Sequence, residues 1–216
     1  MNLKHYVWVF KGALAPDVCD RIIKIALGKQ KQQGLIHGIG MTESGGYKDL
    51  KKHPLTEKQK KDLLEKRDCR VVWLEEPWLY SLLSSYIRIA NKNAEWNFHW
   101  DWTESSQFII YKKHQFYSWH TDSAATIGGP LKGSYGKIRK LSSNILLSDP
   151  STYDGGDFQI DHRMQDPDIQ GQSIWTAPRE RGTIMVFPSF SWHRATPITK
   201  GIRYSITHWH WGQPWK

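Results

Sequence analysis

With 216 residues, of which 39% are hydrophobic, the chain is long enough for one well-cored domain and short for two. The formal net charge is +9, yet the basic residues are dispersed except at residues 48–67, so no basic stripe with interleaved aromatic residues predicts nucleic-acid binding. Two distant cysteines exclude a disulfide framework, and without a long apolar run or a signal peptide we expect a cytoplasmic protein.

The first part of the chain predicts two helices and two strands. Residues 6–10 are β-branched and aromatic, which favours a strand. Residues 15–32 carry a proline at the first turn and apolar residues at helical spacing, with Cys19 as a reduced core residue. Residues 69–74 predict a short strand, and residues 77–96 predict the second long helix. The dense basic segment at residues 48–67, which precedes this strand, is expected to be a solvated, partly helical surface.

From residue 97 the pattern changes to short apolar runs separated by Gly, Pro, Asp and Ser. Many short strands with turn signals between them predict a β-sandwich or a barrel. We therefore expect a single domain over residues 1–216. Its helical N-terminal portion, to about residue 95, would lean on a β-rich portion from about residue 96.

A metal site is suggested by the segment "FYSWHTDS", in which His120 and Asp122 stand two residues apart. Residues i and i+2 of a strand face the same side, so the imidazole and the carboxylate would point to one place. This spacing alone is often structural, and a second histidine is needed. His193 follows a predicted buried strand and a turn. Two histidines and one carboxylate on one face of a metal suit non-haem Fe(II) and oxygen chemistry.

A carboxylate receptor is suggested ten residues after His193, at Arg203. If this segment is a strand, Arg203 shares one face with Ser205, Thr207 and Trp209. A buried guanidinium beside a hydroxyl group binds a carboxylate in bidentate fashion. A metal with open positions and a carboxylate receptor nearby together describe a site for a keto acid.

Three segments carry a specific resemblance to a known family: "YKKHQFYSWHTD" at residues 111–122, "SSNILLSDPSTYDGGDFQI" at 142–160, and "GTIMVFPSFSWHRATPITKGIRYSI" at 182–206. They resemble the Fe(II)/2-oxoglutarate-dependent dioxygenases of the prolyl 4-hydroxylase group, in their compact microbial and viral form. The resemblance covers about residues 105–211, and the N-terminal portion is similar more loosely. It implies a mainly β fold, the double-stranded β-helix or jelly roll, with N-terminal supporting helices.

The resemblance also implies roles for particular residues, by matching position. His120, Asp122 and His193 would hold Fe(II), and Arg203 would pair with the C5 carboxylate of 2-oxoglutarate. Tyr111 matches a tyrosine that often hydrogen-bonds the same co-substrate, Ser205 would be a second partner, and Trp209 would wall the pocket. The chain departs from the group at His114, because a glycine is usual between Tyr111 and Tyr117.

The activity that the resemblance implies is hydroxylation of prolyl residues in a protein or peptide, with conversion of 2-oxoglutarate and O2 to succinate and CO2. Ascorbate would stimulate it, and no catalytic side chain is needed beyond the metal ligands. We expect a monomer that binds neither membranes nor nucleic acid. Two alternatives stay open: an oxygenase acting on another side chain or a small molecule, and a non-catalytic jelly-roll module that binds a metal or a peptide.

Other residues bear on related enzyme classes, on alternative metal ligands and on segments that could cover the site. DNA- and RNA-repair dealkylases carry a second arginine where this chain has Trp209, and iron halogenases have a small residue in place of Asp122. His208 and His210 have the opposite strand parity to Arg203, so they are expected to point away from the pocket. His99, although followed by Asp101, is expected to be structural. Two polar, glycine-bearing segments are candidate lids over the site, residues 123–140 and 38–48.

Overall fold

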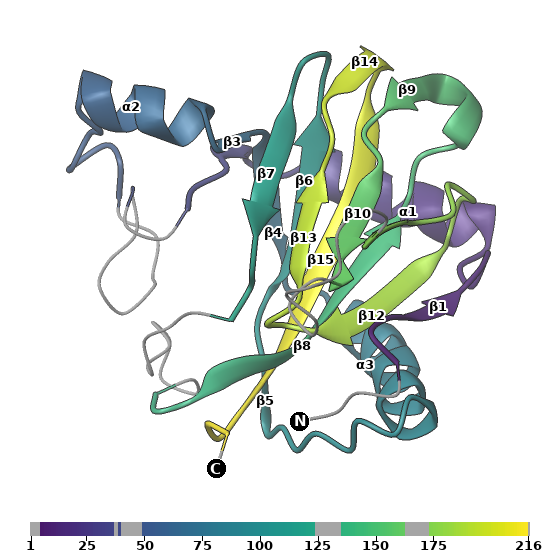
Figure 1. Ribbon diagram of the computed structural model, residues 1–216. Helices are drawn as coiled ribbons and strands as arrows, with labels where there is room; N and C mark the ends of the chain where they lie inside the picture. The colour runs from purple at the N-terminus through teal and green to yellow at the C-terminus, as the bar shows by residue number, and fades with distance from the viewer. Residues whose placement is uncertain (1–4, 37–38, 40–48, 124–134, 163–172, 216) are drawn as a thin grey trace.

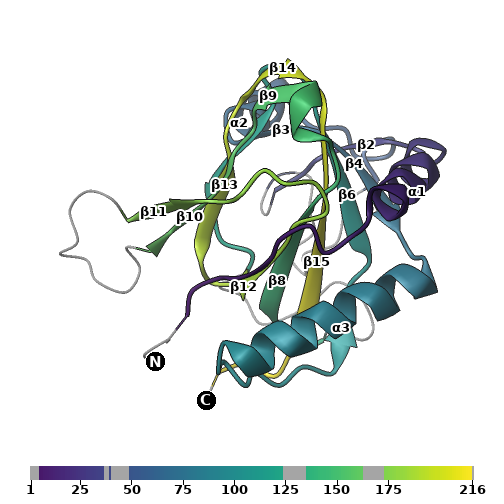
Figure 2. The ribbon, with the colours of Figure 1, turned by 90° about the vertical axis from the view of Figure 1, so that its right-hand side faces the viewer.

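Two antiparallel β-sheets face each other, and helices cover the outer face of the larger sheet (Figures 1 and 2). The structure is a computed structural model that describes residues 5–36, 39, 49–123, 135–162 and 173–215. The candidate lids fall largely on residues 38, 40–48 and 124–134, which lie outside the described residues. Among the described residues, no helix combines the length and the apolar character needed to cross a bilayer.

The larger sheet has eight strands in the order β1-β12-β8-β15-β6-β4-β2, with β5 paired to β15. All its pairings are antiparallel. Its strands are β1 (Trp8–Phe10), β2 (Gln32–Gln33), β4 (Arg70–Leu74), β5 (Trp102–Thr103), β6 (Ser106–Tyr111), β8 (Ile138–Leu146), β12 (Ile184–Pro188) and β15 (Arg203–Gly212).

The smaller sheet has the order β11-β10-β13-β7-β3, and a separate pair joins β14 to β9. From β6 to β8 and again from β11 to β13 successive strands alternate between the two sheets, so the chain winds around a shared interior, as expected for a jelly roll. The strands are β3 (Arg67–Asp68), β7 (Phe116–His120), β9 (Tyr153–Gly155), β10 (Phe158–Asp161), β11 (Ile174–Thr176), β13 (Trp192–Ala195) and β14 (Ile198–Gly201), and a short 3-10 helix, η1 (Pro150–Thr152), precedes β9.

The two predicted long helices are α1 (Pro16–Leu27) and α3 (Pro77–Asn93), and both lie against the outer face of the larger sheet (Figure 2). Their apolar faces and the sheet form the main hydrophobic core, to which Cys19 belongs as a buried free thiol. The first helix ends at Leu27, earlier than predicted, and Gly28 occupies its C-cap in a right-handed conformation, with φ of −76°. The basic segment contains α2 (Glu57–Leu64), which begins with a capping box at Thr56, so its partly helical character is confirmed.

Alternation along β15 divides its side chains between two environments. Ile206 lies in the helix-covered core, and His208 and His210 contact Tyr80 and Ser84 of α3. The residues of opposite parity therefore face the interior between the sheets. This confirms the predicted separation of Arg203 from the two histidines, and it places the interior face of β15 where a ligand can lie.

Candidate metal and carboxylate site

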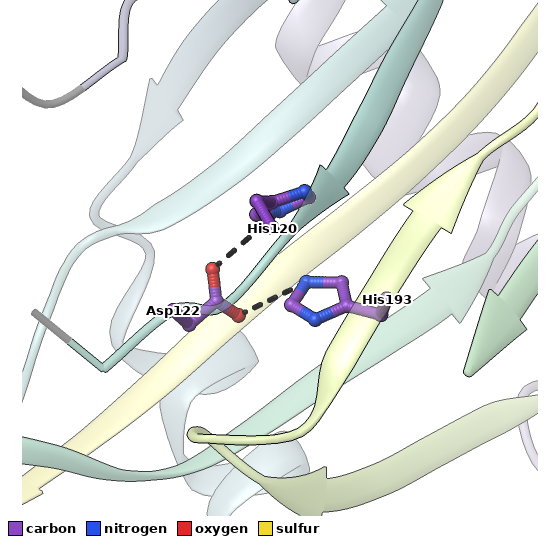
Figure 3. A group of neighbouring side chains, drawn as sticks. All are labelled: His120, Asp122 and His193. Atoms are coloured by element: carbon purple, nitrogen blue, oxygen red, sulfur yellow. Dashed lines mark ion pairs between the residues drawn. The ribbon is translucent and has the colours of Figure 1, made fainter. Parts of the chain in front are cut away.

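The three predicted metal ligands converge in the interior (Figure 3). His120 ends β7, and His193 in β13 is its direct cross-strand partner. Asp122 lies just beyond the strand, where its backbone N–H donates to the Ser189 carbonyl oxygen over 2.9 Å. Nε2 of His193 is 3.4 Å from one Asp122 oxygen, and Nε2 of His120 is 3.9 Å from the other. One ligand atom from each residue lies within 4.8 Å of the others.

Backbone carbonyl groups fix the orientation of both imidazoles. Nδ1 of His120 donates to the Ser118 carbonyl oxygen over 2.8 Å. Nδ1 of His193 donates to the Ser191 carbonyl oxygen over 2.9 Å. Because a carbonyl oxygen only accepts, both rings carry their proton on Nδ1, and both Nε2 atoms keep a lone pair directed at Asp122. This arrangement of outer hydrogen bonds is common for metal-binding histidines.

The charge states of the three side chains suit a divalent cation. Burial, helped by the charge of His193, holds the pKa of His120 well below its usual value, so the ring is neutral at pH 7. Burial raises the pKa of Asp122, but the electrostatic influence of His193, His120 and Arg139 outweighs it and lowers that pKa to about 2. One Asp122 oxygen is buried without a hydrogen-bond partner. A metal ion would satisfy this oxygen and accept both lone pairs, so the donor set fits Fe(II).

A stacked column next to His120 was not foreseen from the sequence. The Tyr117 ring stacks on His120 with 3.5 Å between centroids and 13° between planes. The Arg67 guanidinium carbon lies 4.5 Å from the Tyr117 centroid. Arg67 is buried and donates to the Leu35 carbonyl oxygen and to Oε1 of Gln107, over 2.9 and 2.6 Å. Arg67 closes the basic segment in the sequence, and only its pairing with Tyr117 across β3 and β7 shows that it points inward.

Removing the stack is expected to weaken metal binding. The Tyr117→Leu variant leaves one face of His120 without its aromatic partner, and we expect a roughly three- to tenfold lower affinity for Mn(II), since an aromatic pair contributes about 0.5–1.5 kcal/mol. Isothermal titration calorimetry measures this. Tyr117→Phe retains the ring and should bind Mn(II) like the wild type. Equal affinities in the leucine and phenylalanine variants would show that the stack does not position His120.

Arg203 lies at the start of β15, and 1% of its surface is exposed. It donates from Nη1 to Oγ of Ser205 over 3.2 Å, while Nε and Nη2 have no hydrogen-bond partner. Tyr111 is its direct cross-strand neighbour on β6, with the guanidinium carbon 5.6 Å from the ring centroid. Burial raises the pKa of Tyr111, so its phenol keeps its proton. A buried guanidinium with two free N–H edges lacks an anion, and a ligand carboxylate would supply one.

Trp209 faces the same interior. Its ring centroid lies 6.4 Å from the ring centroid of Trp73 and 3.9 Å from the guanidinium carbon of Arg139. Arg139 is held in place by Glu104 over 2.7 Å. The structure thus brings the predicted Tyr111, Ser205 and Trp209 into the interior that contains Arg203 and the triad. Their roles toward a ligand stay predictions.

His114 adopts the left-handed conformation, with φ of 69°. Glycine takes this conformation without strain, which accounts for the glycine that is usual in this turn. The His114 N–H donates to the Ile198 carbonyl oxygen over 2.7 Å, and this bond holds the turn. The departure therefore leaves Tyr111 in register with Arg203.

The other histidines considered as ligands lie elsewhere. His99 is exposed, and Asp101 pairs with Lys137 over 2.9 Å. His208 and His210 are buried under α3, where Nδ1 of His208 is 2.8 Å from Oγ of Ser106. Among the described residues, the triad is the cluster of metal-ligating side chains that the structure brings together.

Burial of His208 and His210 predicts acid destabilisation. Burial lowers the pKa of His210 to about 3 and that of His208 well below its usual value. Since the unfolded chain takes up these protons near pH 6.5, stability is complete above that pH and falls as the pH decreases. Between pH 6.5 and 5 we expect each histidine to cost about 2 kcal/mol of unfolding free energy.

Urea unfolding at pH 7 and at pH 5 measures this loss of unfolding free energy. The loss should be smaller in His210→Gln than in the wild type, and it should be unchanged in His99→Gln. An identical pH dependence of the unfolding free energy in the wild type and in His210→Gln would contradict the assignment.

Comparison with known proteins supports the same kind of site. Residues 106–211 match the sequence profile of the 2OG-Fe(II) oxygenase superfamily. The PKHD-type hydroxylase of Pseudomonas putida strain W619 is 31% identical over 100 residues, which are 46% of this chain and 39% of that protein. PKHD-type hydroxylase YbiX of Escherichia coli O6:K15:H31 is 32% identical over 102 residues, 47% and 40% of the two chains. The matched part of the chain thus spans about two fifths of the length of these relatives.

Solved structures share the fold across nearly the whole chain. The viral collagen prolyl hydroxylase of Paramecium Bursaria Chlorella virus-1, in its 2OG complex, has a TM-score of 0.62 at 15% identity, covering 97% of both chains. A Pseudomonas putida prolyl-4-hydroxylase has a TM-score of 0.61 at 15% identity, covering 96% of this chain and 93% of that one. The predicted double-stranded β-helix with supporting helices is therefore confirmed.

Proposed function

Because residues 106–211 of this chain belong to the 2OG-Fe(II) oxygenase superfamily, we propose that the protein is an Fe(II)- and 2-oxoglutarate-dependent dioxygenase that hydroxylates prolyl residues in a protein or peptide. One observation carries the proposal. The triad of His120, Asp122 and His193 shares an interior with Arg203, a buried guanidinium whose Nε and Nη2 have no partner. An acid that chelates a metal at the triad with one end and carries a second carboxylate at its other end would bind both the metal and Arg203.

Different side chains would bind the metal and the oxo acid. His120, Asp122 and His193 would hold the metal, and three protein ligands of this kind would leave room for the oxo acid and for oxygen. Arg203, with Ser205 and Tyr111 beside it, would hold the far carboxylate. When bound, the metal and the oxo acid supply the oxidising chemistry, in which O2 and 2-oxoglutarate yield succinate, CO2 and one oxygen atom for the substrate.

Apolar rings pack beside His193, one of the metal ligands. The Phe187 and Phe158 centroids lie 4.8 and 5.7 Å from that of His193. No side chain has to act as a nucleophile or a general base, so the task of the protein is to place and shield the reacting groups. All of these residues come from one chain, and we propose that it acts as a single domain and as a monomer.

Prolyl specificity is supported by relatives and by the walls of the site. A prolyl hydroxylase of Trichoplax adhaerens, solved with a hypoxia inducible factor peptide fragment, shares the fold with a TM-score of 0.65 at 13% identity, covering 96% of this chain and 84% of that one. Trp209 offers a flat aromatic surface beside the triad, and such a surface suits the apolar ring of proline. Another side chain or a small molecule stays the second candidate substrate.

The proposal is tested by supplying Fe(II), 2-oxoglutarate and O2 and measuring succinate, with and without proline-rich peptides and with and without ascorbate. We expect succinate, stimulation by ascorbate, and a peptide mass increase of one oxygen atom on proline. Succinate formation without peptide oxidation would favour another substrate. Absence of both succinate and metal binding would favour a non-catalytic module.

A further inference from the structure

The strand register orders the interior side chains of the larger sheet between the triad and Arg203. On β15 the interior row runs from Trp209 through Thr207 and Ser205 to Arg203. Trp209 pairs with Ser142 of β8, which in turn pairs with Phe187 of β12. The Phe187 ring contacts His193, so the Trp209 row lies level with the triad. Six residues of strand then separate this level from Arg203, about 20 Å along the strand.

Asn144 occupies the next row from the triad toward Arg203. It pairs with Thr207 on one side and Met185 on the other, two residues or about 6.6 Å along the strand from the Trp209 row. Its neighbours confirm which way it faces, because Ile145 belongs to the helix-covered core and Leu146 to the core between the sheets. Asn144 thus lies under the interior between the metal ligands and the carboxylate receptor.

The hydrogen bonds of Asn144 are incomplete. Only 5% of the residue is exposed, yet Oδ1 has no hydrogen-bond partner. Nδ2 reaches Oγ1 of Thr207 over 3.4 Å, which is long for such a bond. A buried amide with an unsatisfied atom is costly unless a ligand completes it. The Thr207 hydroxyl can donate as well as accept, so a half-turn of the amide lets Thr207 bond Oδ1 and presents Nδ2 to the interior.

We propose that Asn144 is a further binding residue for the oxo acid, and that its amide donates to the carboxylate next to the keto group. This inference rests on the proposed function. Arg203 holds the carboxylate at the far end, and the row of Asn144 is the first polar position on the sheet beyond the level of the triad. An amide donor there favours an acid with a carboxylate at its metal-chelating end over a ligand that carries only the far carboxylate.

Two variants test the inference on protein loaded with Mn(II), which binds without turnover, by calorimetric titration with 2-oxoglutarate under nitrogen. Asn144→Ala should bind 2-oxoglutarate about tenfold more weakly, while its affinity for Mn(II) alone stays unchanged. Asn144→Asp should bind it more weakly still, because the new carboxylate repels that of the ligand. The control is Ser143→Ala, since Ser143 adjoins Asn144 on β8 and its Oγ donates to the His208 carbonyl oxygen, on the other face.

The outcomes separate this inference from the function on which it rests. Wild-type affinity for 2-oxoglutarate in both Asn144 variants overturns the inference alone. Tighter Mn(II) binding by Asn144→Asp with unchanged 2-oxoglutarate affinity shows that the new carboxylate attracts the metal but that position 144 does not bind the oxo acid, and overturns it as well. Failure of the Mn(II)-loaded wild type to bind 2-oxoglutarate overturns the proposed function first. Thermal unfolding of each variant establishes that the titrated protein is folded.

Discussion

Replacement of Asp122 by asparagine is expected to lower the affinity for Fe(II) or Mn(II) by about a hundredfold or more and to abolish succinate formation. The amide preserves the size of the side chain but removes the one negative charge among the three ligands. That charge is stable in the interior, since the neighbouring His193, His120 and Arg139 hold the pKa of Asp122 at about 2 despite its burial. Two neutral imidazoles and a neutral amide attract a dication far less. Metal affinity by calorimetry and succinate by mass spectrometry measure the two effects.

The chain offers a matched control at Asp101, which follows His99 with the same spacing. Asp101 is exposed and paired with Lys137, so Asp101→Asn should leave metal affinity and turnover unchanged. Wild-type metal affinity in Asp122→Asn would show that the triad is not the metal site. A large loss in Asp101→Asn would show that the effect does not arise at the triad.

Replacement of Arg203 by methionine is expected to separate stability from function. The affinity of Mn(II)-loaded protein for 2-oxoglutarate should fall by about a hundredfold or more, because a bidentate pair with a carboxylate is lost in a buried site. The unfolding free energy without ligand should stay equal or rise, because methionine fills the space without a buried cation whose Nε and Nη2 lack partners. Mn(II) affinity should not change. Calorimetry and urea unfolding measure the three quantities.

A shift in unfolding temperature gives an independent check. 2-Oxoglutarate should raise the unfolding temperature of the Mn(II)-loaded wild type, since it binds only the folded state, and should leave that of Arg203→Met nearly unchanged. Arg203→Lys keeps the charge without the bidentate geometry, so it should be intermediate. If methionine at this position left 2-oxoglutarate binding intact, the receptor would lie elsewhere.

Local patterns predicted the elements that depend on neighbouring residues. Two-residue alternation placed Arg203 in the interior and His208 on the helix side, and the apolar spacing located α1 and α3. The meeting of His193 with His120 was proposed from the residue types a metal needs and not from a local pattern, because these residues come from separated segments and become partners only through the pairing of β13 with β7. The end of α1 at Leu27 was missed because the polar residues after Gly28 continue a helical composition.

The inward side chains of Arg67 and Asn144 were beyond sequence reasoning for a related reason. Arg67 ends a run of exposed charges, and its burial depends on the pairing of β3 with β7. Asn144 stands in a buried strand, where its face is readable from the alternation, but its place between the triad and Arg203 depends on two neighbouring strands. Contacts that depend on the register between distant strands leave no periodic signal in one strand.

The turn that precedes His193 uses main-chain atoms to hold two of the three metal ligands. The Ser189 carbonyl oxygen accepts from the N–H of Asp122, and the Ser191 carbonyl oxygen accepts from Nδ1 of His193. The side chains of Ser189 and Ser191 supply no atom to either bond, so both bonds depend on the path of the backbone. Insertion or deletion of a single amino acid there would displace a carboxylate and an imidazole together, so the length of this connection is constrained more tightly than its composition.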